Sequence, residues 1–205
     1  LAESSEPIDI ADGPDAVLSW LLDGARRLLA QVGRDDSAVA AIGIGVPGPV
    51  EHSSGKPSTP PIMPGWDGFD IPGWLQAHIP VPVLVDNDVN TMALGERATA
   101  WPSVDNLLFV KIATGIGAGL ISDGHLQRGA QGVAGDIGHV HIARGGDVPC
   151  TCGNRGCLEA LASGPAIART LRATGLEAHT VNDVVDLVKH GNVDAIQAVR
   201  QAGRD

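Results

Sequence analysis

The stretch Val81–Asn90, VPVLVDNDVN, is a run of apolar and largely β-branched residues that ends in alternating Asp and Asn. The apolar part predicts a buried strand over 81–85, and a helix is expected over about 89–100. Ligands of open α/β sheets bind beyond the carboxyl ends of the strands. There, a carboxylate of Asp86 or Asp88 could take a proton from a hydroxyl group while the neighbouring Asn87 amide holds adjacent hydroxyls. The alternative interpretation is a turn and a helix N-cap, since Asp and Asn cap helices well.

The rest of the chain predicts strands alternating with helices, which indicates an α/β fold with a largely buried sheet. Apolar periodicity, glycines and prolines mark the elements and the loops between them. In chain order we expect helix 15–32, strand 38–46, a long loop over 51–72 anchored by Trp66, helix 73–79, strand 106–113, a second strand ending at 121 after which Asp123-Gly124 turns, an aperiodic Gly-rich segment over 124–138, and helices 158–174, 180–190 and 193–203.

Size and charge exclude some classes of protein. The 205 residues are enough for one large domain or two small lobes. The formal net charge of −10 argues against a segment that grips nucleic acid by itself, because phosphate binding needs clustered Lys and Arg. No apolar run is long enough to cross a membrane and no signal peptide is visible, so we expect a cytoplasmic protein that does not bind membranes.

The cysteines indicate a metal site. All three lie between Cys150 and Cys157 in a Cys-x-Cys-x4-Cys run with Cys152, and His139 precedes them by eleven positions. Three thiolates and one imidazole form the closed tetrahedral set that structural Zn²⁺ prefers. Reduced thiols without a metal are the alternative. His141 competes with His139 as the fourth ligand, and the spacing alone does not choose between them.

Two further features carry weaker signals. The segment Thr114–Gly119, TGIGAG, follows a strand, and its backbone amides could form an anion nest for a phosphate. It lacks the Lys and Ser/Thr of a P-loop, and a tight β-hairpin is the alternative. Glu159 follows the cysteines closely. Its carboxylate is either a well-positioned ligand group or a solvated residue in the first turn of the next helix.

Four ordered blocks together resemble the ROK family of repressors, open reading frames and sugar kinases. The resemblance extends from about residue 41 to the helical tail, and the metal-site block is the most specific. The blocks, in family order, are Gly43–Val50 (GIGVPGPV), Val85–Asn90 (VDNDVN), Thr114–Ile121 (TGIGAGLI), and the signature region made of Gly135–His139 (GDIGH) and Cys150–Glu159 (CTCGNRGCLE).

The resemblance implies a two-lobed, actin-like α/β fold that binds a sugar in the cleft between lobes of residues 1–88 and 89–205. It also implies roles for individual residues. Asp88 would be the general base of a kinase. The residues implied in sugar binding are Asn87, Asp88, Asp136, His139 and Glu159. The implied zinc ligands are His139, Cys150, Cys152 and Cys157, and the phosphate-binding residues of a kinase would be Thr114, Gly115 and Gly117.

The resemblance leaves two functional classes open. Family kinases usually carry Glu where Asp136 stands. Neither the Asp-Gly-Gly-Thr phosphate loop nor the C-terminal Gly-Gly segment of those kinases is in this chain, so we expect it to be a piece of a longer protein. The Asp-Ile-Gly-His and Pro60–Trp66 stretches look more like the regulators. We therefore expect the sugar-sensing part of a transcriptional regulator, which binds DNA through a separate N-terminal domain and forms a homo-oligomer. An ATP- and Mg²⁺-dependent hexose kinase is the alternative.

Overall fold

The computed structural model describes residues 1–205, and the chain divides into two compact units. The first unit comprises 1–92 and 129–132, and the second comprises 93–128 and 133–205. Helix α3 (Asp88–Thr99) begins in the first unit and ends in the second. The lobes expected from the resemblance, 1–88 and 89–205, stay a prediction.

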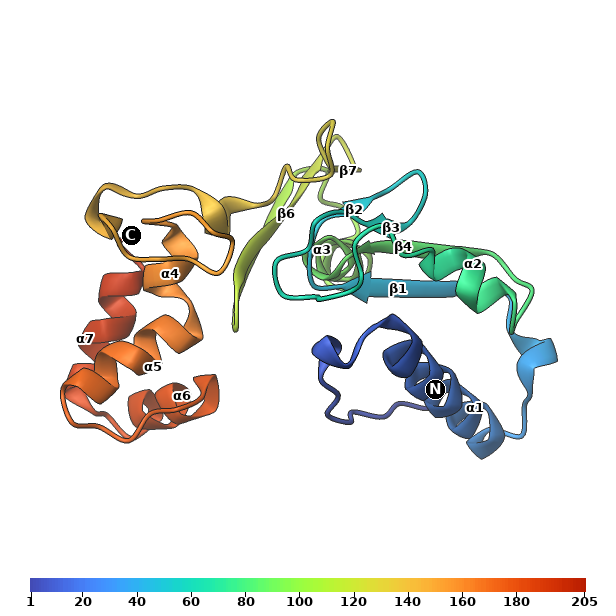
Figure 1. The fold of residues 1–205 in the computed structure, drawn as a ribbon, viewed down its shortest axis with the longest axis horizontal. Coiled ribbons are helices and arrows are strands. Elements are labelled where there is room, and N and C mark those ends of the chain that lie inside the picture. The colour runs from blue at the N-terminus through green and yellow to red at the C-terminus, as the bar shows by residue number, and fades with distance from the viewer. The chain divides into compact units, whose positions relative to one another are not determined.

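A parallel pair of strands lies at the centre of the first unit. β1 (Ile42–Val46) runs beside β4 (Val83–Asn87), with Ile42 opposite Val83 and Val46 opposite Asn87 (Figure 1). The other elements of this unit are the 3₁₀ turns Ile10–Asp12 and Asp36–Ala38, helix α1 (Pro14–Gln31), helix α2 (Ile71–Gln76) and the short antiparallel pair β2 (Val50–Glu51) and β3 (Lys56–Pro57).

The core of the first unit forms where α1, α2 and the long loop before α2 meet the strands. Trp66, from that loop, is 1% exposed, and its indole Nε1–H donates to the Ile10 carbonyl at 3.0 Å, so it anchors the loop as predicted. The buried apolar side chains around it are Val17, Leu18, Val46, Val50, Met63, Ile71, Leu75 and Val85.

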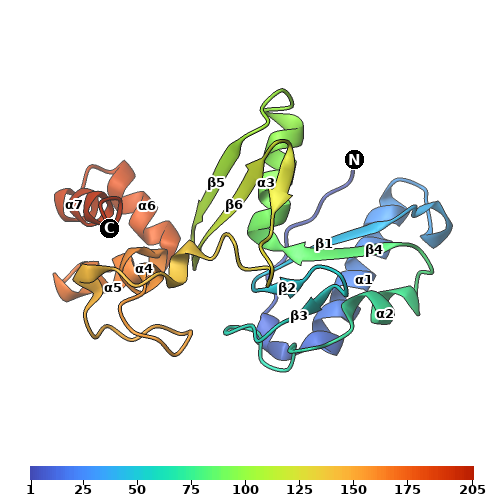
Figure 2. The ribbon, with the colours of Figure 1, turned by 90° about the horizontal axis from the view of Figure 1, so that it is seen from above.

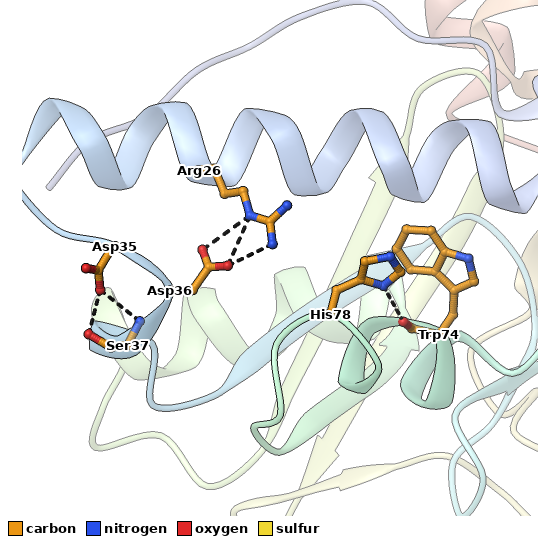
Figure 3. Close-up of polar contacts among 6 residues, drawn as sticks. All are labelled: Arg26, Asp35, Asp36, Ser37, Trp74 and His78. Atoms are coloured by element: carbon orange, nitrogen blue, oxygen red, sulfur yellow. Dashed lines mark hydrogen bonds and ion pairs between the residues drawn. The ribbon is translucent and has the colours of Figure 1, made fainter.

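Polar contacts on the surface fix the ends of these elements (Figure 3). Arg26, on α1, donates from Nε and Nη2 to the Asp36 carboxylate at 3.0 and 2.8 Å, which ties the helix to the 3₁₀ turn that leads toward β1. On α2, the rings of Trp74 and His78 stack with centroids 4.2 Å apart. These groups are solvated, so they fix geometry more than they add stability.

The second unit combines an antiparallel sheet with four helices. The strands β5 (Leu107–Ile112), β6 (Ile116–Ser122) and β7 (His125–Gln127) lie in that order. The helices are α4 (Leu158–Ala162), α5 (Gly164–Ala173), α6 (Val181–Lys189) and α7 (Val193–Ala202), and α5, α6 and α7 pack against one another (Figure 2). The 3₁₀ turns Ile137–His139 and Ala143–Gly145 belong to the same unit.

The structure corrects three predictions of elements. The single helix over 158–174 is wrong, because the chain turns extended at Ser163 (φ −68°, ψ 162°) and α5 starts afresh with Pro165 in its first turn. The segment 124–138 was expected to be aperiodic, but it contains β7, too short to show a period. β1 is less buried than predicted: of its five residues only Val46 is buried, since its one partner is β4. No helix is both long enough and apolar enough to cross a membrane.

Candidate functional site

The second unit brings four metal-binding side chains together. One ligand atom from each of His139, Cys150, Cys152 and Cys157 lies within 4.8 Å of all the others. His139 ends a 3₁₀ turn, Cys157 precedes α4, and the other two cysteines lie in the loop between them. That loop is held by antiparallel bridges between His141 and Cys157 and between Pro149 and Arg155. The backbone therefore brings His139 together with cysteines that lie eleven to eighteen positions after it.

The spacing of the donor atoms fits a tetrahedral ion. Cys152 Sγ and Cys157 Sγ are 3.7 Å apart, as are Cys150 Sγ and His139 Nδ1. Bonds of about 2.3 Å to sulfur and 2.0 Å to nitrogen, at tetrahedral angles, require separations of about 3.8 Å between two sulfurs and about 3.5 Å between sulfur and nitrogen. These two distances are close to the values for a tetrahedral ion, and all four donor atoms lie within 4.8 Å of one another, so the cluster could hold a metal ion.

The structure separates the two candidate histidines. His139 directs Nδ1 toward Cys150, whereas its Nε2 is 4.0 Å from the Asp136 carboxylate. An acid next to the second ring nitrogen is the usual way in which proteins orient a ligating imidazole. His141 is exposed, and its ring lies against Gly156, so it is outside the cluster.

The environment of the thiols determines how easily they ionise. Burial raises the pKa of Cys157 to about 12. Burial also acts to raise the pKa of Cys152, but hydrogen bonds from Asn154 and the neighbouring thiols outweigh it and lower that pKa. Because metals bind the thiolate, an ion that enters the cluster must displace the Cys157 proton.

In the first unit, the Asp86–Asn90 segment forms a hydrogen-bond network at the end of β4. Asn87 Oδ1 accepts from the N–H groups of Val89 and Asn90 at 2.9 and 3.3 Å, so Asn87 caps α3. Its Nδ2 donates to the Gly48 carbonyl at 3.0 Å. The alternative role considered for this segment, a helix cap, is therefore present. Whether Asn87 also binds a sugar stays a prediction.

Sequence reasoning missed two members of this network. The buried Asn90 donates from Nδ2 to the Asp86 carboxylate at 2.9 Å, and His52 Nδ1 lies 3.8 Å from the same carboxylate. The sequence gives no clear signal for the first contact, because Asp86 lies in β4 and the i, i+4 rule applies only within a helix. Nothing in the sequence indicates the second, because His52 follows β2, far from β4 in the chain. Asp88, the predicted base, is the first residue of α3.

The TGIGAG segment folds as a hairpin in the second unit, which is the alternative considered for it. Residues 113–115 form the turn between β5 and β6, with the Ala113 N–H bonded to the Gly115 carbonyl at 2.9 Å. Gly117 lies within β6, opposite Lys111. The Glu159 carboxylate accepts from the Ile116 N–H at 2.9 Å, so it is not a solvated residue of the helix. Phosphate binding by Thr114, Gly115 and Gly117 stays a prediction.

Comparisons of sequence identify the family. The model of the ROK family matches residues 10–205. The chain is 34% identical over 191 residues to a glucokinase of Halalkalibacterium halodurans, covering 92% of this chain and 57% of the relative. It is 31% identical over 194 residues to the xylose repressor of Bacillus subtilis, covering 94% and 50%. The chain thus spans about half the length of these relatives.

Solved structures give the same result. A ROK hexokinase from Thermus thermophilus superposes with a TM-score of 0.73 at 32% identity, covering 95% of this chain and 63% of that one. A ROK transcriptional regulator, a homologue of the Escherichia coli MLC protein, gives a TM-score of 0.78 at 28% identity, covering 93% and 50%. The fold class is the actin-like α/β class predicted from the sequence, and the chain belongs to the ROK family.

Proposed function

We propose that this chain is the sugar-sensing effector domain of a ROK-family transcriptional regulator. The observation that carries the proposal is the Asp136–His139 arrangement. Asp136 stands where the sugar kinases of the family usually carry Glu, and its shorter side chain lies beside the ring nitrogen of His139 that faces away from the thiols. The likeness to xylose repressors and to a regulator structure, over more than nine-tenths of the chain, supports the same choice.

The metal in this proposal is a structural Zn²⁺ held by His139, Cys150, Cys152 and Cys157. When bound, the ion would cross-link its four ligands in a fixed tetrahedral geometry and would take no part in a reaction. The chain's own residues would recognise the ligand. This metal centre would fix the loop before α4, and with it the ring of His139 and the carboxylate of Glu159. Contacts of this kind, which support a functional side chain from behind, hold that side chain within about 0.5 Å of its productive position.

The proposed ligand is a hexose or a hexose derivative. Its hydroxyl groups would meet acceptors and donors among the residues that the family resemblance implies in sugar binding: Asn87, Asp88, Asp136, His139 and Glu159. A neutral polyol suits this set, because carboxylates accept from hydroxyls whereas an anionic ligand would be repelled by them. DNA would be bound by a separate N-terminal domain of a homo-oligomer. The sugar need bias DNA affinity by only about 1–3 kcal/mol to act as an effector.

A sugar kinase is the second candidate, and a specific observation favours it. Asp88 follows the end of β4 directly, at the carboxyl edge of the sheet where a general base would act. The glucokinase and hexokinase relatives match the chain about as well as the repressors do. In that case ATP and Mg²⁺ would be bound in the full-length protein, with the hairpin at Thr114 near the phosphates.

One experiment separates the two functions. The full-length protein is titrated calorimetrically with a panel of hexoses and N-acetylhexosamines, and ATP turnover with each sugar is measured in parallel. Sugar binding without turnover, together with a sugar-dependent change in operator affinity, supports the regulator. Turnover that disappears in Asp88→Asn, with sugar binding retained, supports the kinase and refutes the first proposal.

A further inference from the structure

Glu159 lies against the backbone of the hairpin between β5 and β6. Its Oε2 accepts from the Ile116 N–H at 2.9 Å, across 43 positions of sequence. A Cβ atom on Gly115 would be 2.6 Å from the same oxygen, so a side chain at residue 115 would have to displace the carboxylate from this position. Glu159 is half-buried, where a charge-assisted hydrogen bond is stronger than on an open surface.

The same part of the hairpin is held by two other backbone contacts. The Gly164 N–H, at the start of α5, donates to the Ala113 carbonyl at 2.9 Å. Gly138, next to His139, approaches the Ile116 carbonyl so closely that a Cβ there would be 2.2 Å from the oxygen. The first turn of α4 thus lies beside the start of β6 (Figure 2).

Glu159 is also close to the metal cluster in the chain. It is two residues beyond Cys157, the most buried of the four metal-binding side chains, and the Leu158 N–H between them donates to the Val140 carbonyl at 2.9 Å. The backbone between the thiol and the carboxylate is therefore short and fixed at both ends. A change in the position of Cys157 must move the carboxylate, since no flexible segment separates them.

We propose that Glu159 is a positioning residue that couples the metal cluster to the hairpin at Ala113–Ile116. An occupied cluster holds Cys157, Cys157 places the Glu159 carboxylate, and that carboxylate holds the Ile116 N–H. One acceptor site of the carboxylate is then used within the protein, and its remaining sites, including both of Oε1, can accept from a ligand. The coupling rests on the metal centre and on contacts within one unit, so it applies to a sensor and to a kinase.

Amide exchange at Ile116 tests the coupling without any sugar. Hydrogen exchange of the full-length, zinc-loaded protein is compared with that of Glu159→Ala and Glu159→Gln. Loss of a hydrogen bond to a carboxylate should speed exchange at Ile116 by about tenfold or more in the alanine variant. The glutamine variant keeps an acceptor oxygen at the same place and should restore most of the protection. Glu177→Ala is the matched control, because Glu177 is an exposed glutamate outside both the metal cluster and the hairpin, and this change should not alter exchange at Ile116.

Removal of the metal by a chelator supplies the second arm. Exchange at Ile116 should rise as zinc is lost, while the β6–β7 pairing around Ile121 and Leu126 stays protected. Unchanged exchange at Ile116 in Glu159→Ala, or after complete zinc removal, would overturn the coupling. Equal loosening of the whole unit in the alanine and glutamine variants would also overturn it, since that pattern indicates a general role in folding. Absence of sugar binding would affect only the proposed function.

Discussion

Replacing Gly138 with alanine should disturb the fold and the metal cluster together. The added Cβ would lie 2.2 Å from the Ile116 carbonyl oxygen and 3.1 Å from its carbon, where ordinary contacts begin at 3.4 Å. Both atoms belong to backbone, so no rotamer change relieves the clash and the two segments must separate by about 1 Å. Overpacking of this kind costs about 1–3 kcal/mol. For a chain of this size, that corresponds to a fall in Tm of roughly 2–12 °C.

Calorimetric unfolding of the full-length protein, with zinc content measured in the same samples, checks this expectation. Because His139 is the next residue, we also expect metal affinity to fall by about 10–100-fold, as when the support of a metal ligand is lost. Gly95→Ala is the matched control: no atom lies within 4 Å of its new Cβ, and an alanine within α3 should stabilise the protein by about 0.5–1 kcal/mol. If Gly138→Ala melted with the wild type and kept its metal, the close approach of residues 138 and 116 would be refuted.

Four further predictions have defined outcomes. Cys152→Ser should release the metal and lower Tm, because binding and folding are coupled, and unchanged zinc content by atomic absorption would contradict the metal site. Asp88→Asn should abolish any phosphoryl transfer yet leave calorimetric sugar affinity largely intact; undiminished ATP turnover would remove Asp88 as the base. Thr180→Ala should cost about 1 kcal/mol in urea unfolding, because it breaks the capping box of α6. Backbone N–H groups of His179 and Thr180 hold the pKa of Asp183 below its ordinary value, so its contribution to stability is complete above that ordinary value and is lost as pH falls through the lowered one. The protection factors of the α6 amides, corrected for the intrinsic pH dependence of exchange, should therefore fall in acid, but not in Asp183→Asn.

The sequence predicts the elements whose signals are local. α1 was expected over 15–32 and spans Pro14–Gln31, because a 3.6-residue apolar period and a proline at the first position act within the helix itself. α6 was expected to start near Thr180, and Thr180 and Asp183 form a reciprocal capping box there. The turn at Asp123-Gly124 is confirmed for the same reason: both residues adopt positive φ.

Elements that depend on distant contacts were missed. The break between α4 and α5 is stabilised by the Gly164 N–H, which donates to Ala113 in another part of the chain. β2 and β3 each contain two residues, too few to show a period. The spacing of the cysteines indicated the metal cluster, but the choice between the two histidines depended on the backbone. The backbone turns His139 toward Cys150, whereas His141 pairs with Cys157 only through a backbone β-bridge.

The contacts of Asn87 restrict what it can do for a sugar. Its carbonyl oxygen has two lone pairs, and the N–H groups of Val89 and Asn90 take both. Its amide nitrogen has two hydrogens, of which the Gly48 carbonyl takes one. A hydroxyl bound by Asn87 must therefore accept from the remaining hydrogen and donate elsewhere. Asp86 and Asp88 both adjoin Asn87 in the chain, and Asp88 is the acceptor that the family resemblance implies. A hydroxyl in that position is polarised by a donor and an acceptor at once. That arrangement would suit a sugar hydroxyl in a sensor as well as in a kinase, so an intact Asn87–Asp88 pair does not distinguish the two proposed functions. The capping of α3 by itself favours Asn at residue 87.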